Sequence, residues 1–158
     1  MSDESKGEVH ELAVTSGFKM GSSLAADGHI ITYPQRLLTL AQESIDRGEY
    51  SISIVVSHIA CEVATDRAFA QAFRAKKIEY LENAIEKLLP GNNLGNENVR
   101  RIYTAMTGDE IQNQPFWRRF KDSAARRNKV SHNSMIYEKS DAEASLVVAK
   151  EFVAHLNQ

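Results

Sequence analysis

The spacing of hydrophobic residues divides the chain near Tyr33. Residues 1–31 show no sustained helical period and contain four glycines, so we expect an irregular arm with at most short strands, such as one around Ile30. From Pro34 onward, hydrophobic residues recur every three or four positions, which is typical of helices that bury one face. The sequence therefore predicts an N-terminal arm over residues 1–32 and a helical domain over residues 33–158.

The helical part contains five or six predicted helices. The first begins at Pro34 and ends near Gly48, and the second covers residues 51–76. The second is hydrophobic on nearly all sides, as expected of the most buried helix in a bundle. Its predicted packing stripe consists of Ile52, Val55, Val56, Ile59, Val63, Ala70 and Phe73.

Four further helices follow in the pattern. They are predicted at residues 78–89, at 97–106 between an Asn96 cap and Gly108, at 115–130, and from Ser140 onward, where a capping-box sequence opens the last helix. The predicted fold class is all-α, a bundle of four core helices with one or two short ones.

Composition narrows the setting of this domain. The 158 residues suit one domain, and Cys61 is the only cysteine, so no intrachain disulfide can form and the cytoplasm is the simplest compartment. The N-terminus is acidic, unlike a signal peptide, and the longest apolar run is shorter than the ~20 residues of a membrane span. We therefore expect a cytoplasmic protein with no membrane segment.

Charge is concentrated in one segment, although the formal net charge is only −2. Between Pro115 and His132, one acid, Asp122, stands against six basic residues, which are Arg118, Arg119, Lys121, Arg126, Arg127 and Lys129. Such a run is either a solvated helix face or a surface for an anion such as RNA.

Arg127 is predicted to lie on the hydrophobic side of this helix, not on its solvated side. At ~100° per residue it falls about 20° from Phe116, on the stripe of Phe120 and Ala124. A guanidinium on an apolar stripe needs an acidic partner or a bound anion. His132 would lie about 140° away on a continuous helix, so we expect the helix to end near Val130 and the unwound turn to bring His132 beside Arg127.

Residues 126–132 read RRNKVSH and resemble the signature of the HEPN superfamily, an Arg followed after four to six residues by a His, often with a polar residue directly after the Arg. The segment SIVVSHIACEVATDRAF is similar to the Ala-rich early core helix of these bundles, and its embedded acid would be Glu62. The likeness covers roughly residues 34–158.

The resemblance implies a metal-independent endoribonuclease that leaves 2′,3′-cyclic phosphate and 5′-hydroxyl ends. His132 would be the acid/base, Arg127 the phosphate clamp and Asn128 a neutral donor, with Glu62 orienting the arginine. Such domains usually form homodimers that bring two motifs to one cleft, and a toxin or anti-phage setting with a cognate inhibitor protein fits this class. The expected RNA-binding residues are Arg119, Lys121, Arg126 and Lys129, and no cofactor or metal is expected.

Two alternatives remain open at this point. His58, Glu62 and Asp66 recur every four residues and could hold a metal. The favoured interpretation is an ion pair with Arg127, in which Glu62 is the first choice of acid and Asp66 the second. The other alternative is a catalytically silent HEPN bundle that serves as a dimerisation, nucleotide-binding or partner-binding module, in which Arg127 holds an internal ion pair.

Overall fold

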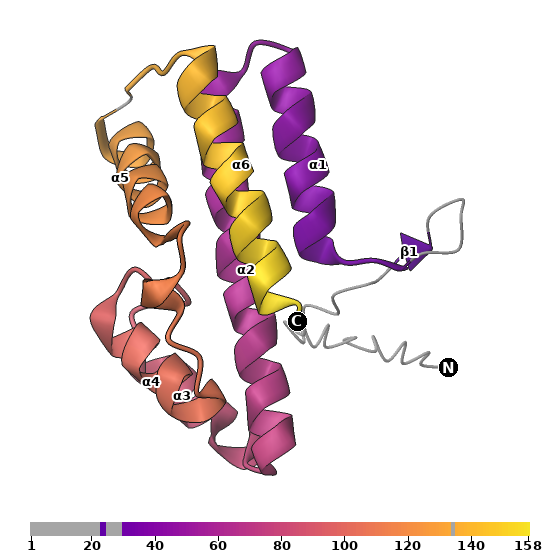
Figure 1. Cartoon of the computed structure of the whole chain (residues 1–158), viewed down its shortest axis with the longest axis vertical. Coiled ribbons are helices and arrows are strands. Elements are labelled where there is room, and N and C mark those ends of the chain that lie inside the picture. The colour runs from indigo at the N-terminus through magenta and orange to yellow at the C-terminus, as the bar shows by residue number, and fades with distance from the viewer. Residues whose placement is uncertain (1–22, 25–29, 134) are drawn as a thin grey trace, which may run out of the picture.

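The computed structural model describes residues 23–24, 30–133 and 135–158, and this part of the chain is an all-α bundle, as predicted (Figure 1). The α-helices are α1 (Tyr33–Asp46), α2 (Tyr50–Lys76), α3 (Glu82–Leu88), α4 (Glu97–Thr107), α5 (Trp117–Asn133) and α6 (Lys139–Leu156). Short 3-10 helices lie at η1 (Glu79–Leu81) and η2 (Ile111–Asn113). Before α1, the two-residue strands β1 (Ser23–Leu24) and β2 (Ile30–Ile31) pair antiparallel.

Helix α2 is the centre of the bundle. Its 27 residues run the length of the domain, and it contacts α1, α6 and α5 (Figure 1). Helix α4 and η1 pack against α2 as well, and α3 follows η1 directly. The residues of the candidate site on α2 and α5 are therefore fixed by a direct helix–helix contact.

Three helix ends follow the local sequence signals, whereas the predicted capping box at Ser140 is wrong, because α6 begins after Glu138 and has no side-chain cap there. At the start of α1, Thr32 and Gln35 form a capping box, with Pro34 in the first turn. At the start of α4, the Asn96 side chain accepts from the backbone N–H groups of Asn98 and Val99. Gly108 ends α4 in the left-handed region, with φ of 76°, as the sequence predicts.

The buried face of α2 differs from the predicted stripe. Ile52 is 53% exposed, and Val56, Ile59 and Val63 are only partly buried at the edge of the core. Of the predicted stripe only Phe73 is buried, and most of the other buried residues of α2 are small or polar: Ser53, Ile54, Ser57, His58, Ala60, Cys61, Ala64, Thr65, Ala68 and Phe69. A helix packed on several neighbours needs small side chains where the backbones approach, so most of its large aliphatic residues lie at the borders, and of these residues only Ile54 is fully buried.

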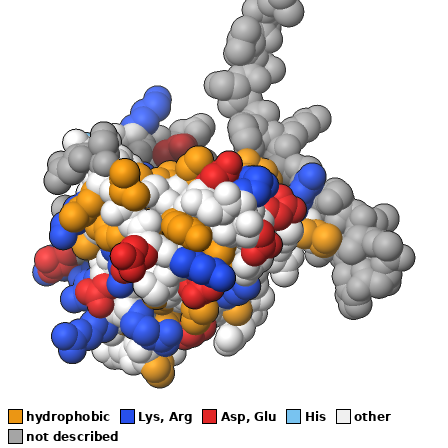
Figure 2. Space-filling model, turned by 90° about the horizontal axis from the view of Figure 1, so that it is seen from above, with side chains coloured by type: hydrophobic (Ala, Val, Ile, Leu, Met, Phe, Trp, Pro, Cys, Tyr) orange, Lys and Arg blue, Asp and Glu red, His pale blue; other side chains and the backbone are white. Residues whose placement is uncertain are grey.

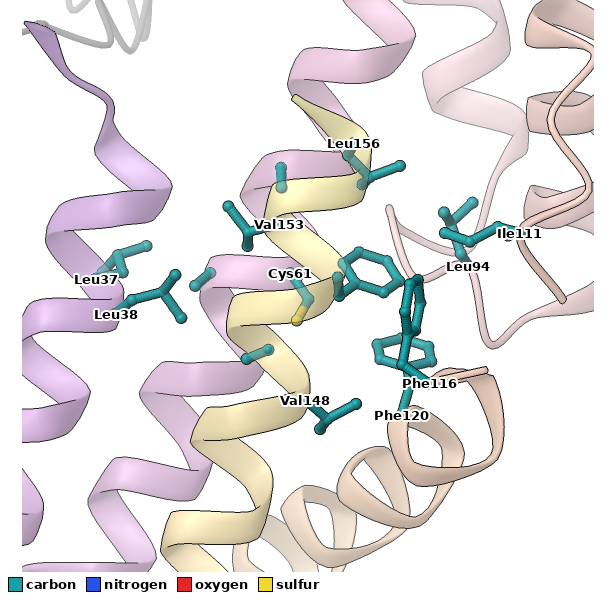
Figure 3. Packing of buried hydrophobic residues seen from close by; sticks show 14 of the residues in the cluster. Leu37, Leu38, Cys61, Leu94, Ile111, Phe116, Phe120, Val148, Val153 and Leu156 are labelled. Carbon is teal, nitrogen blue, oxygen red and sulfur yellow. The ribbon is translucent and has the colours of Figure 1, made fainter. Parts of the chain in front are cut away.

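An aromatic cluster fixes the first half of α5. Phe120 stacks on Phe152 of α6 with ring centroids 4.4 Å apart, and Phe116 meets the same ring edge-on at 6.0 Å. Figure 3 shows the rings of Phe116 and Phe120 between α6 and two fully buried residues, Leu94 in a loop and Ile111 at the start of η2. The aromatic residues of this segment therefore belong to the core.

Within the part of the chain that has been placed, none of the helices combines the length and the apolar character that crossing a membrane requires.

Candidate functional site

Helix α5 continues through His132 without a break. It extends to Asn133, so the predicted end near Val130, and with it the approach of His132 to Arg127, is wrong. Ser131, His132 and Asn133 are compatible with a helical last turn, and no proline or glycine interrupts them. On a regular helix the two side chains project about 140° apart. One chain therefore does not bring Arg127 and His132 together, and the His132 side chain is exposed.

The side chain of Arg127 extends from α5 toward α2, where it forms an ion pair with Glu62. Its Nη2 is 3.5 Å from Oε1 of Glu62, and both side chains are close to 30% exposed, at 28% and 30%. Its Nη1 donates to Oδ1 of Asn128 at 3.2 Å. The expected ion pair with Glu62 is present, and Asp66 instead accepts a hydrogen bond from Asn92 at 3.1 Å. Asn128 contacts the guanidinium directly.

His58 joins the same group from the core side. It is 1% exposed, and its ring stacks on Phe120 with centroids 6.0 Å apart. Its Nε2 lies 3.5 Å from Oε1 of Glu62 and 3.2 Å from Nδ2 of Asn93. The sequence showed the four-residue spacing of His58 and Glu62, but the contribution of Asn93 comes from a loop that carries no pattern.

The two acids one turn apart on α2 differ in their electrostatics. The neighbouring His58 side chain and the charge of Arg127 lower the pKa of Glu62 below its ordinary value, against the effect of partial burial. Partial burial and the charge of Glu86 raise the pKa of Asp66, against a hydrogen bond from Asn92. Glu62 is therefore the firmly ionised partner for an arginine.

The ladder of His58, Glu62 and Asp66 does not converge on one point. Across residues 30–133 and 135–158, no group of three or more His, Cys, Asp or Glu side chains is arranged to hold a metal ion. Cys61, on the same helix, is buried, and burial together with the nearby charge of Glu62 raises the pKa of its thiol. Its neutral thiol belongs to the core.

The basic residues expected to bind RNA fall into two groups. Arg119 donates two hydrogen bonds of 2.8 Å to Glu151, and Arg126 Nε lies 3.2 Å from Oδ1 of Asp141, so both connect α5 to α6. Lys121 and Lys129 are exposed. Figure 2, which views the end where α5 finishes and α6 begins, shows basic, acidic and hydrophobic side chains interspersed. Part of the positive charge of α5 thus serves packing within the domain.

An open hollow of about 510 Å³ lies beside Glu62. Its lining combines the acids Glu62 and Asp66 with uncharged residues, which are Tyr33, Ile59, Val63, Gly91 and Asn92. The acidic lining does not favour a phosphate inside this hollow, because like charges repel at short range.

The fold and site define an all-α bundle with an arginine held by an acid of the central helix. Comparisons with protein-family models, curated proteins and solved structures gave no match to this chain. The residues themselves, and the resemblance carried by the Arg127–His132 segment, are therefore what points to a function.

Proposed function

We propose that the chain is a metal-independent endoribonuclease that acts as a homodimer in the cytoplasm. The observation that carries this proposal is the state of Arg127, which is partly exposed, held from one side by Glu62 and in contact with Asn128. A guanidinium fixed in this way is ready to receive a phosphate without reorganising.

The chemistry assigns one task to each residue. The 2′-hydroxyl of the RNA attacks the adjacent phosphorus, the bond to the 5′-oxygen breaks, and a 2′,3′-cyclic phosphate remains. Arg127 and Asn128 stabilise the charge that builds on the phosphate oxygens, and His132 transfers a proton at the attacking or leaving oxygen. Lys121 and Lys129, both exposed, supply additional contacts to the RNA backbone.

A second copy completes the site in this proposal. His132 and Arg127 project to different sides of α5, so a two-fold arrangement is needed to bring the histidine of one copy to the arginine of the other. Hydrophobic residues suited to such a contact are exposed at the same end of the bundle, with Ile52 at 53%, Met135 at 47% and Ile136 at 90%. A nuclease of this kind also needs restraint in its host, and a cognate inhibitor protein is the partner we expect.

A specific observation favours a second candidate function. Arg119 and Arg126 are engaged by acids of α6, and Arg127 itself holds an ion pair within the chain. This is the arrangement expected of a catalytically silent bundle that binds a partner protein or nucleotide or that dimerises. The two candidates differ in one measurable property, which is cleavage of RNA.

The deciding experiment is incubation of the chain with mixed RNA in excess chelator, followed by analysis of the fragment ends. The nuclease proposal expects cyclic phosphate and 5′-hydroxyl ends, with R127A reducing turnover by roughly 10²- to 10³-fold, by analogy with deleted oxyanion donors. Intact RNA with the wild-type dimer would support the silent bundle. Activity that vanishes with chelator and returns with one metal would contradict the proposed chemistry.

A further inference from the structure

His58 is a buried polar side chain at the junction of α2, α5 and the loop before α4. Its Nε2 has two neighbours, the amide nitrogen of Asn93 at 3.2 Å and a carboxylate oxygen of Glu62 at 3.5 Å. That same oxygen of Glu62 is the one 3.5 Å from Arg127. A chain of contacts therefore leads from the loop, through His58 and Glu62, to the guanidinium.

The orientation of the Asn93 amide follows from its other partner. Its Oδ1 accepts a hydrogen bond of 2.8 Å from the backbone N–H of Gly95, and a backbone N–H can only donate. The amide NH₂ is consequently the group that faces His58. A donor in that position needs a lone pair on Nε2.

One nitrogen cannot serve both neighbours. When Nε2 carries a lone pair it accepts from Asn93 and offers Glu62 no hydrogen, and the ring proton resides on Nδ1, a buried atom that has no hydrogen-bond partner among the described residues. When Nε2 carries the proton it donates to Glu62, and its N–H then faces the NH₂ group of Asn93, which is also a donor. The two contacts are mutually exclusive, and the shorter one in this structure is to Asn93.

We propose that His58 is a positioning residue for Arg127. The amide of Asn93 donates a hydrogen bond to the imidazole Nε2, and the Glu62 carboxylate is thereby left to pair with the guanidinium. The functional part of this inference rests on the proposed nuclease activity; the proton assignment does not. Displacing Asn93 converts Nε2 into a donor, and Glu62 is then shared with His58 at the expense of Arg127.

The loop is built to hold Asn93 in place. Leu94, the next residue, is fully buried, and its backbone carbonyl accepts a hydrogen bond of 3.1 Å from Arg100. A Cβ added at Gly95 would lie 2.9 Å from Asn93 Oδ1, too close for any side chain to be accommodated without movement. Gly95 thus permits the close turn that aims the amide at His58.

The direct test is the proton position on His58, read from the imidazole ¹⁵N resonances of the full chain by two-bond ¹H–¹⁵N correlation at neutral pH. We expect Nε2 to resonate as an unprotonated nitrogen and Nδ1 as a protonated one. Observation of a proton on Nε2 in the wild-type chain would overturn the proposal, whether or not the chain cleaves RNA.

Two variants of the loop provide the perturbation. N93D keeps an oxygen for Gly95 but presents another oxygen to His58, so the Nε2 resonance should move to the protonated range. N92D adds the same charge one residue away, where the native side chain contacts Asp66 rather than His58, and should leave the pattern unchanged. G95A, which displaces the Asn93 side chain, should shift the resonance in the direction of N93D.

Turnover is the second measurement on these variants. N93D should lower kcat relative to N92D, on the order of tenfold, as is typical of coupled sites, with less change in RNA affinity. A shifted resonance with unchanged kcat would refute the positioning role. If the wild-type chain cleaves no RNA, the nuclease proposal fails while the wild-type resonance pattern still confirms or refutes the assignment of His58.

Discussion

The ion pair between Arg127 and Glu62 should stabilise the fold more than its long distance suggests. At 3.5 Å, two unit charges attract by about 1 kcal/mol in water and about 5 kcal/mol at an effective dielectric constant near 20. With side chains 28% and 30% exposed, the pair lies between these limits, and solvent screening places our expectation at about 1–2 kcal/mol.

A double-mutant cycle measures this quantity. The free energy of unfolding in urea is determined for the wild type, R127M, E62Q and the double variant, and the coupling is the departure from additivity. The pKa of Glu62 is lowered in the folded state, so the stabilisation is fully present above the ordinary carboxyl pKa of 4.5 and is lost as pH falls through the lower folded value.

The matched control is the exposed ion pair between Arg101 and Glu97 on α4. Its atoms are closer, at 2.6 Å, but the side chains are 75% and 64% exposed, so we expect a coupling of about 0.5 kcal/mol or less. Burial rather than distance would then decide the strength. Equal couplings in the two cycles, or a larger one on α4, would refute this reasoning.

Three further predictions concern single variants. D66N should stabilise the fold at neutral pH, because the raised pKa of Asp66 means that its ionisation opposes folding; urea unfolding should show a gain that vanishes as pH falls below the ordinary value of 3.8, and a loss at neutral pH would contradict it. H132A should abolish RNA cleavage while leaving the unfolding midpoint unchanged, since the side chain is exposed; wild-type turnover would remove His132 from the mechanism. R126A should weaken RNA binding in a salt-dependent manner and lower stability slightly through loss of Asp141, whereas R127A should lower kcat at every salt concentration; equal, salt-sensitive defects would make Arg127 an ordinary surface arginine.

The helical pattern and three of the helix-end signals could be predicted from sequence because those signals are local, although the capping box expected at Ser140 is not formed. Pro34, Asn96 and Gly108 act through their own backbone and immediate neighbours, and the structure has each of them where the sequence predicts. The Arg127 contact with Glu62 was also predictable, since a guanidinium on an apolar stripe requires a partner on the facing helix.

Other features depend on which helix lies opposite. Ile52 was expected in the core, but α2 is hydrophobic on nearly all sides, so its periodicity did not identify the buried face. Arg119 resembled an RNA contact because Glu151, its bidentate partner, is 32 positions away in another helix. The continuation of α5 through His132 was not predicted, because the polar residues of its last turn are compatible both with the end of a helix and with its continuation.

The uneven attachment of α5 has a consequence for motion. Its first half is held by Trp117, Phe120 and Ser123, all buried, whereas residues 124–132 include no buried side chain and rely on partly exposed ion pairs such as Arg126 with Asp141. Amide hydrogen exchange should therefore show a gradient along this helix, with protection falling toward its C-terminal end and falling further in high salt. The helix would therefore open from the end that carries Arg127 and His132, while the end held by the aromatic cluster stays closed.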